Sequence, residues 1–378
     1  MENLVIKIGI YAICKNEEAH IAKWVETHKS ADRIVVVDTG STDNSFNLLK
    51  SFESVLPNLI VEQHIFEEFR FDDAKNYAMS KLKKFTTADD MWLFGCLDLD
   101  EFLCDNGVSL LKELWDGSSD KVKINATTAD SGFNCVSENK FHKRSDYVRW
   151  VNPVHETLIF LPPPPLLPSV QQLSPKVYYI HDPDNSKPRN YLPLLLIAEK
   201  EHPKDIGILS YICWELTAQN DINLFETYIT KYLNVIQTTP NKSEHLLYYY
   251  NYIFNNNYLA IDKKLSFVDE FIKYANSHNY SIEPNLAILF NSLKTSQKYE
   301  EAEKLCHKII CNSENIQILC GTYIRLTLLN YYEKKNYENA FAYAILANNA
   351  ISTEITKLNL KICQTKYFEV KSKIDETN

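Results

Sequence analysis

The 378-residue sequence lacks the positive charge that nucleic-acid binding requires. Its formal net charge is −9, and no block of roughly 5–8 residues is dominated by lysine and arginine. It also lacks any uninterrupted apolar run near the ~18 residues that cross a membrane. We therefore expect no nucleic-acid partner and no transmembrane segment. Residues 1–18 carry charges within their apolar part and show no cleavage site, so no signal peptide is expected.

Paired cysteines are also missing. The nine cysteines form no C-x-x-C pair, their number is odd, and several lie inside apolar runs. This usage indicates buried thiols in a reducing compartment and not a disulfide framework, so we expect a cytoplasmic protein. The chain is long enough for two domains, and its 45% hydrophobic content allows a sizeable core.

The first half of the chain alternates candidate strands with candidate helices. The strands are residues 5–13, 33–37, 58–65 and a run that ends at Asp98, and the helices are residues 17–29, 45–52 and 71–82. This order predicts an α/β domain with a mostly parallel sheet. A more irregular, strand-rich stretch follows, with candidate strands at residues 121–127, 147–151, 157–161 and 176–180.

The second half is helical and repetitive. Apolar helices are expected at residues 208–218, 245–254, 286–293 and 323–332, each followed by a polar break and a second helix near Ile222, Ala260, Tyr299 and Tyr337. These starts are 38, 39 and 38 residues apart, a period typical of stacked helical hairpins. An irregular bundle is the alternative. We expect domains at 1–188 and 189–378, with the tyrosines of 248–252 in the repeat core and not forming a sugar-stacking platform.

Three carboxylates end the apolar run of residues 91–103, namely Asp98, Asp100 and Glu101. Ligands of open α/β sheets collect at the carboxyl ends of such strands. In an extended chain, Asp98 and Asp100 would project the same way and could hold one hard cation. A lone D-x-D is also common in solvated turns. The neighbouring segments therefore have to distinguish a metal site from such a turn.

Four neighbouring segments supply further candidates. Asp38 follows a buried strand and precedes a glycine turn; because the helix cap does not need it, it is free to accept hydrogen bonds from a ribose or base. The loop of residues 14–18 lies at the same edge, either as a site or as a simple cap. Lys75 near a helix start is either a surface charge or a diphosphate partner. His155 and Glu156 are a candidate metal ligand and base, although most such pairs are neither.

Taken in order, the phrases KNEE (15–18), VDTGSTDNS (37–45), FDDAKNYA (71–78), DLDEF (98–102) and PVHE (153–156) resemble the family 2 glycosyltransferases of GT-A fold. The likeness is closest to bacterial members that carry helical repeats after the catalytic domain, and it covers about residues 8–190. The later repeats resemble tetratricopeptide-type repeats without that family's full Trp/Gly/Pro pattern. The D-x-D-E-F-L phrase is also similar to one of a neighbouring eukaryotic-type family.

This resemblance implies a role for each matching residue. The nucleoside would be held by Asp38 and by the strand-one edge with Ala12, Cys14 and Glu17. The nucleotide would meet Lys75, where the family usually has arginine, and Asp98. A metal ion, Mn²⁺ or Mg²⁺, would be bound by Asp98, Asp100 and His155.

The resulting hypothesis is a metal-dependent, inverting glycosyltransferase with a nucleotide-sugar donor, UDP-linked, and a glycan, lipid-linked or protein acceptor. Glu156 is the expected base and Glu101 the alternative. The repeat domain would hold the acceptor or a partner, a second copy of the chain included. One rival is a sugar nucleotidyltransferase, which would need a glycine-rich loop where residues 12–18 have no glycine. The other is a scaffold with an inactive GT-A domain, which the intact acidic residues disfavour.

Overall fold

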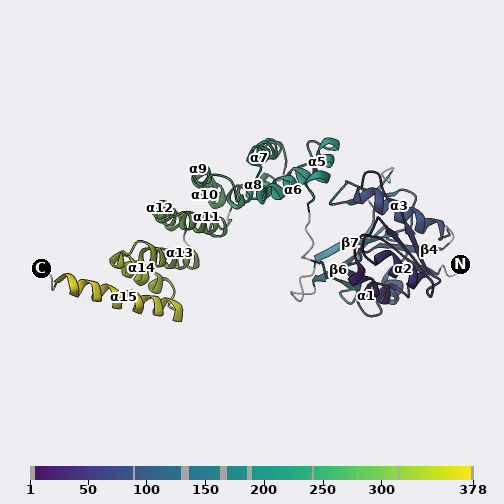
Figure 1. Ribbon diagram of the computed structural model, residues 1–378, viewed down its shortest axis with the longest axis horizontal. Coiled ribbons are helices and arrows are strands. Elements are labelled where there is room, and N and C mark those ends of the chain that lie inside the picture. The colour runs from purple at the N-terminus through teal and green to yellow at the C-terminus, as the bar shows by residue number, and fades with distance from the viewer. Residues whose placement is uncertain are drawn as a thin grey trace. The chain divides into compact units, whose positions relative to one another are not determined.

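The computed structural model describes residues 5–375 except 88–89, 129–135, 162–167, 185–189, 241, 279 and 314. The chain forms two compact units, Met1–Glu201 and His202–Asn378 (Figure 1). The boundary expected at residue 188 lies outside the described residues. Helix α5 (Leu192–Glu201) belongs to the first unit, where Glu201 forms an ion pair with Arg70.

The first unit is built on a nine-stranded sheet. One half is parallel, in the order β3-β2-β1-β4, with the bounds β1 Ile6–Cys14, β2 Arg33–Asp38, β3 Leu59–Gln63 and β4 Met91–Cys96. The other half continues as β7-β6-β11-β5, with β10 beside β6. Its bounds are β5 Glu101–Leu103, β6 Lys121–Thr128, β7 Val136–Lys143, β10 Val170–Gln172 and β11 Tyr178–His181. A separate hairpin pairs β8 (Val148–Val151) with β9 (Thr157–Phe160).

Both faces of the parallel half are covered, which explains its nearly continuous apolar strands. One face packs against α1 (Glu18–His28), α2 (Ser45–Glu53) and α4 (Gly107–Leu114) through Trp24, Leu49 and Leu111. The other packs against α3 (Phe71–Lys84) and the β8–β9 hairpin through Leu82 and Trp150. The expected α/β domain is thus confirmed. Antiparallel β7 joins β4 to β6, so the sheet is mixed and not parallel throughout.

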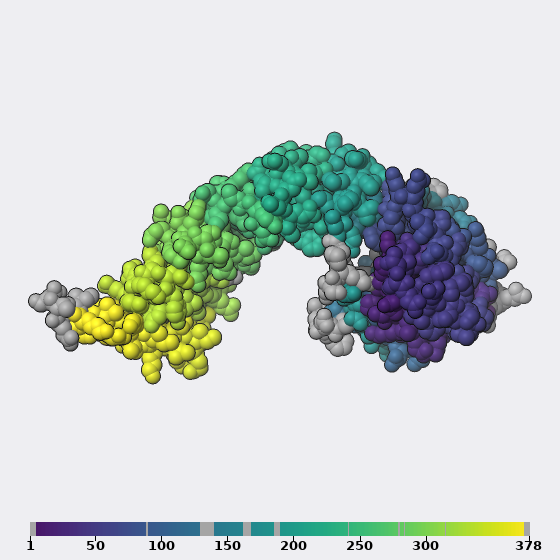
Figure 2. All heavy atoms as spheres, in the orientation of Figure 1, coloured from purple at the N-terminus to yellow at the C-terminus, as the bar shows by residue number. Residues whose placement is uncertain are grey.

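The second unit contains only helices among its described residues. Its bounds are α6 Ile206–Thr217, α7 Ile222–Ile236, α8 Lys242–Asn255, α9 Ile261–Ser266, α10 Val268–Ser277, α11 Glu283–Thr295, α12 Tyr299–Cys311, α13 Ile316–Leu328 with a π-turn to Glu333, α14 Tyr337–Ala350 and α15 Glu354–Asp375. Second helices begin at Ile222, Ile261, Tyr299 and Tyr337, which are 39, 38 and 38 residues apart, so one start lies a residue after the predicted Ala260 and the others lie where predicted. Helices pack within hairpins, as α6 with α7, α11 with α12 and α13 with α14, and between hairpins, as α6 with α8 and α8 with α11. The colours of Figure 2 follow the chain along this unit. No helix in the described residues is long and apolar enough to span a membrane.

The tyrosine stripe of α8 is only partly core. Tyr249 and Tyr250 are buried as expected, whereas Tyr248 is exposed. The expectation that the whole stripe lies in the repeat core is therefore wrong. A helix turns 100° per residue, so consecutive tyrosines cannot all face the same neighbour.

Candidate functional site

The candidate site lies at the carboxyl edge of the parallel strands. In the strand register, Cys14 at the end of β1 pairs with Asp38 at the end of β2, and Asp38 pairs with Gln63 of β3. On the other side of β1, Tyr11 pairs with Cys96, so the chain leaves β4 toward Asp98 at this same edge. The loops after β1, β2 and β4 therefore border one surface.

The first two of these loops are joined by side chains. Asn16 adopts a left-handed backbone (φ 58°), and its Oδ1 accepts a hydrogen bond from the Thr42 amide at 2.7 Å. In return, Ser41 Oγ accepts from the Asn16 amide at 2.9 Å and Ser45 Oγ from the Glu17 amide at 2.8 Å. Short polar side chains thereby satisfy the amides of the facing loop, which fixes both loops as one rim.

Asp38 is fully buried at the base of this rim. Its Oδ1 accepts hydrogen bonds from the amides of Gly40 and Ser41, both at 3.1 Å, and from Gln63 Nε2 at 2.9 Å. Asp38 thus takes no part in capping α2, whose N-cap is Asn44, but one of its carboxylate oxygens builds the preceding turn. The other oxygen, Oδ2, has no hydrogen-bond partner among the described residues. A hydrogen-bond donor on a ligand could therefore pair with Asp38 Oδ2.

The three residues expected at the strand-one edge, Ala12, Cys14 and Glu17, lie in different environments. Ala12 and Cys14 are buried in the core shared with α1 and α2, and burial raises the pKa of the Cys14 thiol to about 12. Their side chains face the core, and the Cys14 carbonyl accepts hydrogen bonds from the Thr39 amide at 2.8 Å and the Thr39 hydroxyl at 3.1 Å. Glu17 lies at the start of α1, where its Oε2 is 2.7 Å from His20 Nδ1.

The D-x-D segment is a turn and not the end of an extended strand. Strand β4 stops at Cys96, and the Glu101 amide donates to the Asp98 carbonyl at 2.9 Å. Leu97 and Leu99 are buried, whereas the side chains of Asp98 and Asp100 are 37% and 19% exposed. The two aspartates therefore alternate with apolar anchors. The anchors hold the turn to the core while the carboxylates stay accessible.

Asp98 lies between two lysines, the buried Lys75 and the partly buried Lys140. Lys75 Nζ from α3 is 3.7 Å from Asp98 Oδ1 and 2.7 Å from Glu156 Oε1. Lys140 Nζ from β7 is 4.0 Å from Asp98 Oδ2 and 2.7 Å from Glu101 Oε1. The interpretation of Lys75 as a surface charge is therefore wrong. Lys140 was missed, because residues 129–143 showed no strand-like pattern.

Burial and charge act in opposite directions on this cluster. Burial alone would lower the pKa of Lys75, but Asp98 and Glu156 outweigh it and hold the pKa above the usual value. Burial alone would raise the pKa of Asp98, but Lys75 and Lys140 bring it below its usual value. Burial raises the pKa of Glu101 to about 7, although Lys140 opposes the shift. The cluster thus holds fixed charges of both signs next to one carboxyl group that titrates near neutrality.

Two histidines, His181 and His155, differ in what they contact. His181 at the end of β11 lies with Nε2 3.4 Å from Asp100 Oδ2, and this hydrogen bond raises the pKa of the imidazole. His155 lies in the β8–β9 loop, with its ring centroid 5.9 Å from that of Tyr191. Among the described residues, no three His, Cys, Asp or Glu side chains are already grouped to hold a metal ion.

The β8–β9 loop that carries Glu156 is fixed to α3. Asn76 Nδ2 donates to the Trp150 carbonyl at 2.8 Å, and Asn76 Oδ1 accepts from the Trp150 amide at 2.9 Å. The Phe71 amide donates to the Pro153 carbonyl at 3.0 Å. His155 has a left-handed backbone (φ 52°), which is uncommon outside glycine and is found at functional sites more often than elsewhere. Helix α3 therefore positions both Lys75 and Glu156.

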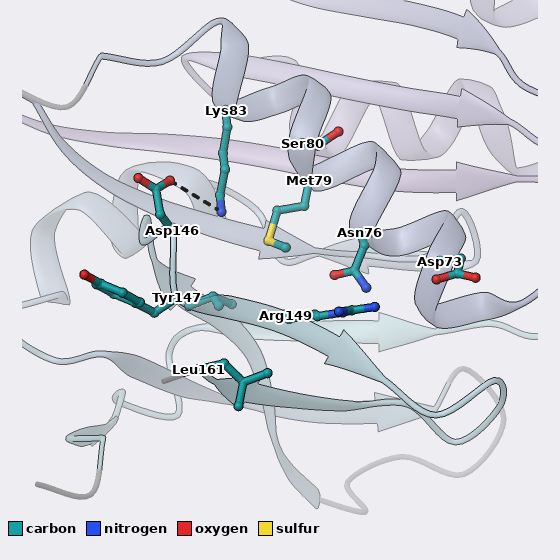
Figure 3. A pocket seen from close by; sticks show the side chains of 10 residues that line it. Asp73, Asn76, Met79, Ser80, Lys83, Asp146, Tyr147, Arg149 and Leu161 are labelled. Carbon is teal, nitrogen blue, oxygen red and sulfur yellow. Dashed lines mark ion pairs between the residues drawn. The ribbon is translucent and has the colours of Figure 1, made fainter. Parts of the chain in front are cut away.

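A separate hollow of roughly 420 Å³ lies along α3 and β8. Figure 3 shows Asn76, Met79 and Lys83 on the helix facing Arg149 and Tyr147 on the strand side. None of the residues predicted from the sequence as site residues lines it. We therefore place the candidate site at the sheet edge and not in this hollow.

Comparisons with known proteins give limited similarity. The chain is 29% identical over 117 residues to the lipopolysaccharide core biosynthesis glycosyltransferase LpsC of Rhizobium meliloti (strain 1021), a match that covers 31% of this chain and 40% of the relative. No protein-family model matches the chain. Among solved structures, S. aureus TarS 1-349 has a TM-score of 0.34 at 13% identity and 92% coverage of both chains. The mannosyltransferase PcManGT of Pyrobaculum calidifontis, in complex with GDP-Man and Mn²⁺, has a TM-score of 0.35 at 12% identity, covering 71% of this chain and 80% of that one.

Proposed function

We propose that this chain is a metal-dependent, inverting glycosyltransferase that transfers a sugar from a UDP-sugar to a glycan, lipid-linked or polypeptide acceptor. One observation carries the proposal. A single sheet edge presents the unsatisfied carboxylate oxygen of Asp38 and the buried charge cluster around Asp98. The sequence similarity to a glycosyltransferase over 117 residues supports the same class.

Donor recognition is assigned to the rim of the first two loops. A buried acceptor without a donor is costly, and a ribose hydroxyl or a base N–H would satisfy Asp38 Oδ2. The other carboxylate oxygen is fixed by three hydrogen bonds, so the group is oriented before the ligand arrives. The Glu17 end of the first loop would border the base.

The acidic turn fits a divalent cation that arrives with the nucleotide. Mg²⁺ and similar ions are often held by one or two carboxylates, with phosphate oxygens of the substrate completing the shell. Asp98 and Asp100 are two accessible carboxylates on one turn, and His181 is the imidazole beside Asp100. His155, the histidine implied by the family resemblance, lies in the β8–β9 loop beside Glu156 and is a further candidate ligand. When bound, the cation would neutralise charge on the leaving diphosphate.

The lysines complement this role. Lys75 and Lys140 lie beside three acidic side chains, Asp98, Glu101 and Glu156. A diphosphate placed at the edge would add negative charge next to two preorganised ammonium groups, which stabilises charge that develops during transfer. Lysine acts as a point charge and tolerates a range of phosphate positions, unlike arginine.

Glu156 is proposed as the base that deprotonates the acceptor hydroxyl. Both oxygens of Glu101 are occupied, one by Lys140 at 2.7 Å and the other by the Asp98 amide at 2.9 Å, so Glu101 is better suited to hold the D-x-D turn. Glu156 lies in a loop and pairs with Lys75 through one oxygen. The pKa of Glu101 near 7 keeps it as the second candidate, because general bases work best near the operating pH.

Thermal shift tests donor binding directly. A ligand that binds only the native state at 100 times its Kd adds about 2.7 kcal/mol of stability. A panel of UDP-, GDP-, ADP- and CMP-sugars with and without Mn²⁺ should raise the midpoint for UDP-sugars in a cation-dependent way. If no nucleotide sugar shifts the wild-type midpoint, the donor assignment is wrong. That result would favour the alternative hypothesis, a scaffold protein with an inactive GT-A domain. Release of pyrophosphate from UTP and a sugar phosphate would instead indicate a nucleotidyltransferase.

A further inference from the structure

The helical unit contains a groove of roughly 980 Å³ that the proposed chemistry does not use. It is lined by three consecutive first helices of the hairpins, α6, α8 and α11, and by the short segments near Asn257 and Tyr280. In Figure 1 these helices follow one another along the unit. The groove lies entirely within residues 211–288, so it belongs to the second unit alone.

Two kinds of side chain dominate the lining. Aromatic rings come from α6, α8 and the Tyr280 segment, and amides come from α8, Asn257 and α11: Tyr211, Trp214, Tyr248, Tyr252, Tyr280, Asn251, Asn255, Asn257 and Asn285. The Tyr248 and Tyr252 rings lie nearly parallel, with centroids 6.4 Å apart and 22° between their planes. Trp214 is 56% exposed. A large, accessible aromatic surface is therefore available to a ligand.

None of the fourteen lining residues is charged. A phosphate-bearing or acidic ligand would find no lysine or arginine in the groove, and a basic peptide would find no carboxylate among the lining residues. The occupant that fits is uncharged. Aromatic faces and uncharged hydrogen-bonding groups together define its chemistry.

Asn285 is the most specific feature of the lining. It is only 6% exposed, yet its side chain borders the groove. Its position at the wall lets the amide form hydrogen bonds with a bound ligand. An amide offers two donors and an acceptor, and a sugar hydroxyl both donates and accepts. The C–H faces of a sugar ring are apolar and would pack against the aromatic rings.

We propose that this groove binds an uncharged oligosaccharide of hexose units. A proline-rich peptide is the competing occupant of an aromatic groove, but its prolines have no N–H and would leave the carbonyl oxygens of the asparagine side chains unsatisfied. The identification of this oligosaccharide as the acceptor chain rests on the proposed transferase function. Binding itself does not depend on it.

The test is titration of the full-length protein with uncharged tetrasaccharides of glucose, galactose and mannose, followed by saturation-transfer NMR and tryptophan fluorescence. At least one should bind. Trp214→Ala and Tyr248→Ala should each weaken it by roughly tenfold, the effect expected for a binding hot spot. Tyr332→Ala is the matched control, because Tyr332 is a comparably exposed helical aromatic outside the groove. Asn285→Ala should weaken binding too, with circular dichroism confirming that the variant is folded.

The outcomes separate this proposal from the transferase assignment. Absence of binding to all three sugars, equal loss in Tyr332→Ala, or tight binding of a decaproline peptide in their place would overturn the groove assignment. Sugar binding at the groove without turnover of any nucleotide sugar would leave this inference standing and refute the transferase. If both hold, Trp214→Ala should raise KM for a long acceptor more than it raises KM for a monosaccharide glycoside.

Discussion

Lys75→Met should strongly destabilise the first unit. Lys75 is buried, and its ammonium group lies 2.7 Å from Glu156 and 3.7 Å from Asp98. Removing one partner of a buried ion pair leaves uncompensated charge and typically costs about 3–5 kcal/mol. We expect a loss of that size in the free energy of unfolding at pH 7, measured by urea denaturation of the full chain.

The loss of stability caused by Lys75→Met should depend on a second substitution, Glu156→Gln. Glu156→Gln in the Lys75→Met background removes one of the stranded charges, so the double variant should recover part of the loss. The coupling between the two positions should exceed roughly 0.5 kcal/mol, as it does for groups in direct contact. Lys81→Met is the control, because Lys81 on the same helix pairs with the more exposed Glu62. Exposed pairs contribute about 0–1 kcal/mol.

The pH dependence gives a further check. The pKa of Lys75 is raised, so its stabilising contribution is present at neutral pH and is lost only at strongly alkaline pH. The pKa of Asp98 is lowered, so its contribution is lost as the pH falls through the acid range. The penalty of Lys75→Met should therefore shrink below about pH 4, where the stranded carboxylates take up protons. A penalty below 1 kcal/mol at pH 7, or strict additivity with Glu156→Gln, would refute the placement of Lys75 in a buried charge cluster.

Four further outcomes are expected. Asp38→Ala should weaken nucleotide binding in calorimetry by about 1–3 kcal/mol, because one buried acceptor is lost; unchanged affinity would remove Asp38 from the donor site. Glu156→Gln should leave donor affinity nearly unchanged while transfer falls roughly 10²–10⁴-fold, and the reverse pattern would assign Glu156 to donor binding. Asp100→Asn should abolish Mn²⁺-dependent transfer with an unaltered circular dichroism spectrum, and wild-type turnover would contradict the cation assignment. Glu101 has its pKa raised from 4.5 to about 7, so the native state binds the extra proton and stability should fall as pH rises through that window; Glu101→Gln should flatten this slope in denaturation curves, and an unchanged slope would contradict the assignment of this titration to buried Glu101.

Local patterns were sufficient to predict much of the fold. The helix expected at residues 71–82 is α3, Phe71–Lys84, because its apolar residues recur with helical spacing. The second helices starting at Tyr299 and Tyr337 begin where the repeated Tyr-Glu-x-Ala phrase places them. Both helix predictions were possible because the underlying contacts are local in the sequence or repeat along the chain.

Long-range pairing was the part that the sequence could not supply. Strand β7 brings Lys140 beside Glu101, and strand β11 brings His181 beside Asp100. Neither strand has a strong alternating pattern, and the pairings of β7 with β4 and of β11 with β5 join strands that are far apart in sequence. The turn after Cys96 was also missed, because buried Leu97 and Leu99 continue the apolar run past the point where the strand ends.

The interlocked rim of the first two loops sets a rule for engineering the donor preference that we have proposed for it. Asn16 satisfies amides in the second loop, while Ser41 and Ser45 satisfy amides in the first. A loop grafted alone from another enzyme would strand backbone groups on both sides and lose its shape. Residues 14–18 and 39–45 therefore form one exchangeable cassette, and altered sugar-nucleotide selectivity should be sought in libraries that vary both halves together.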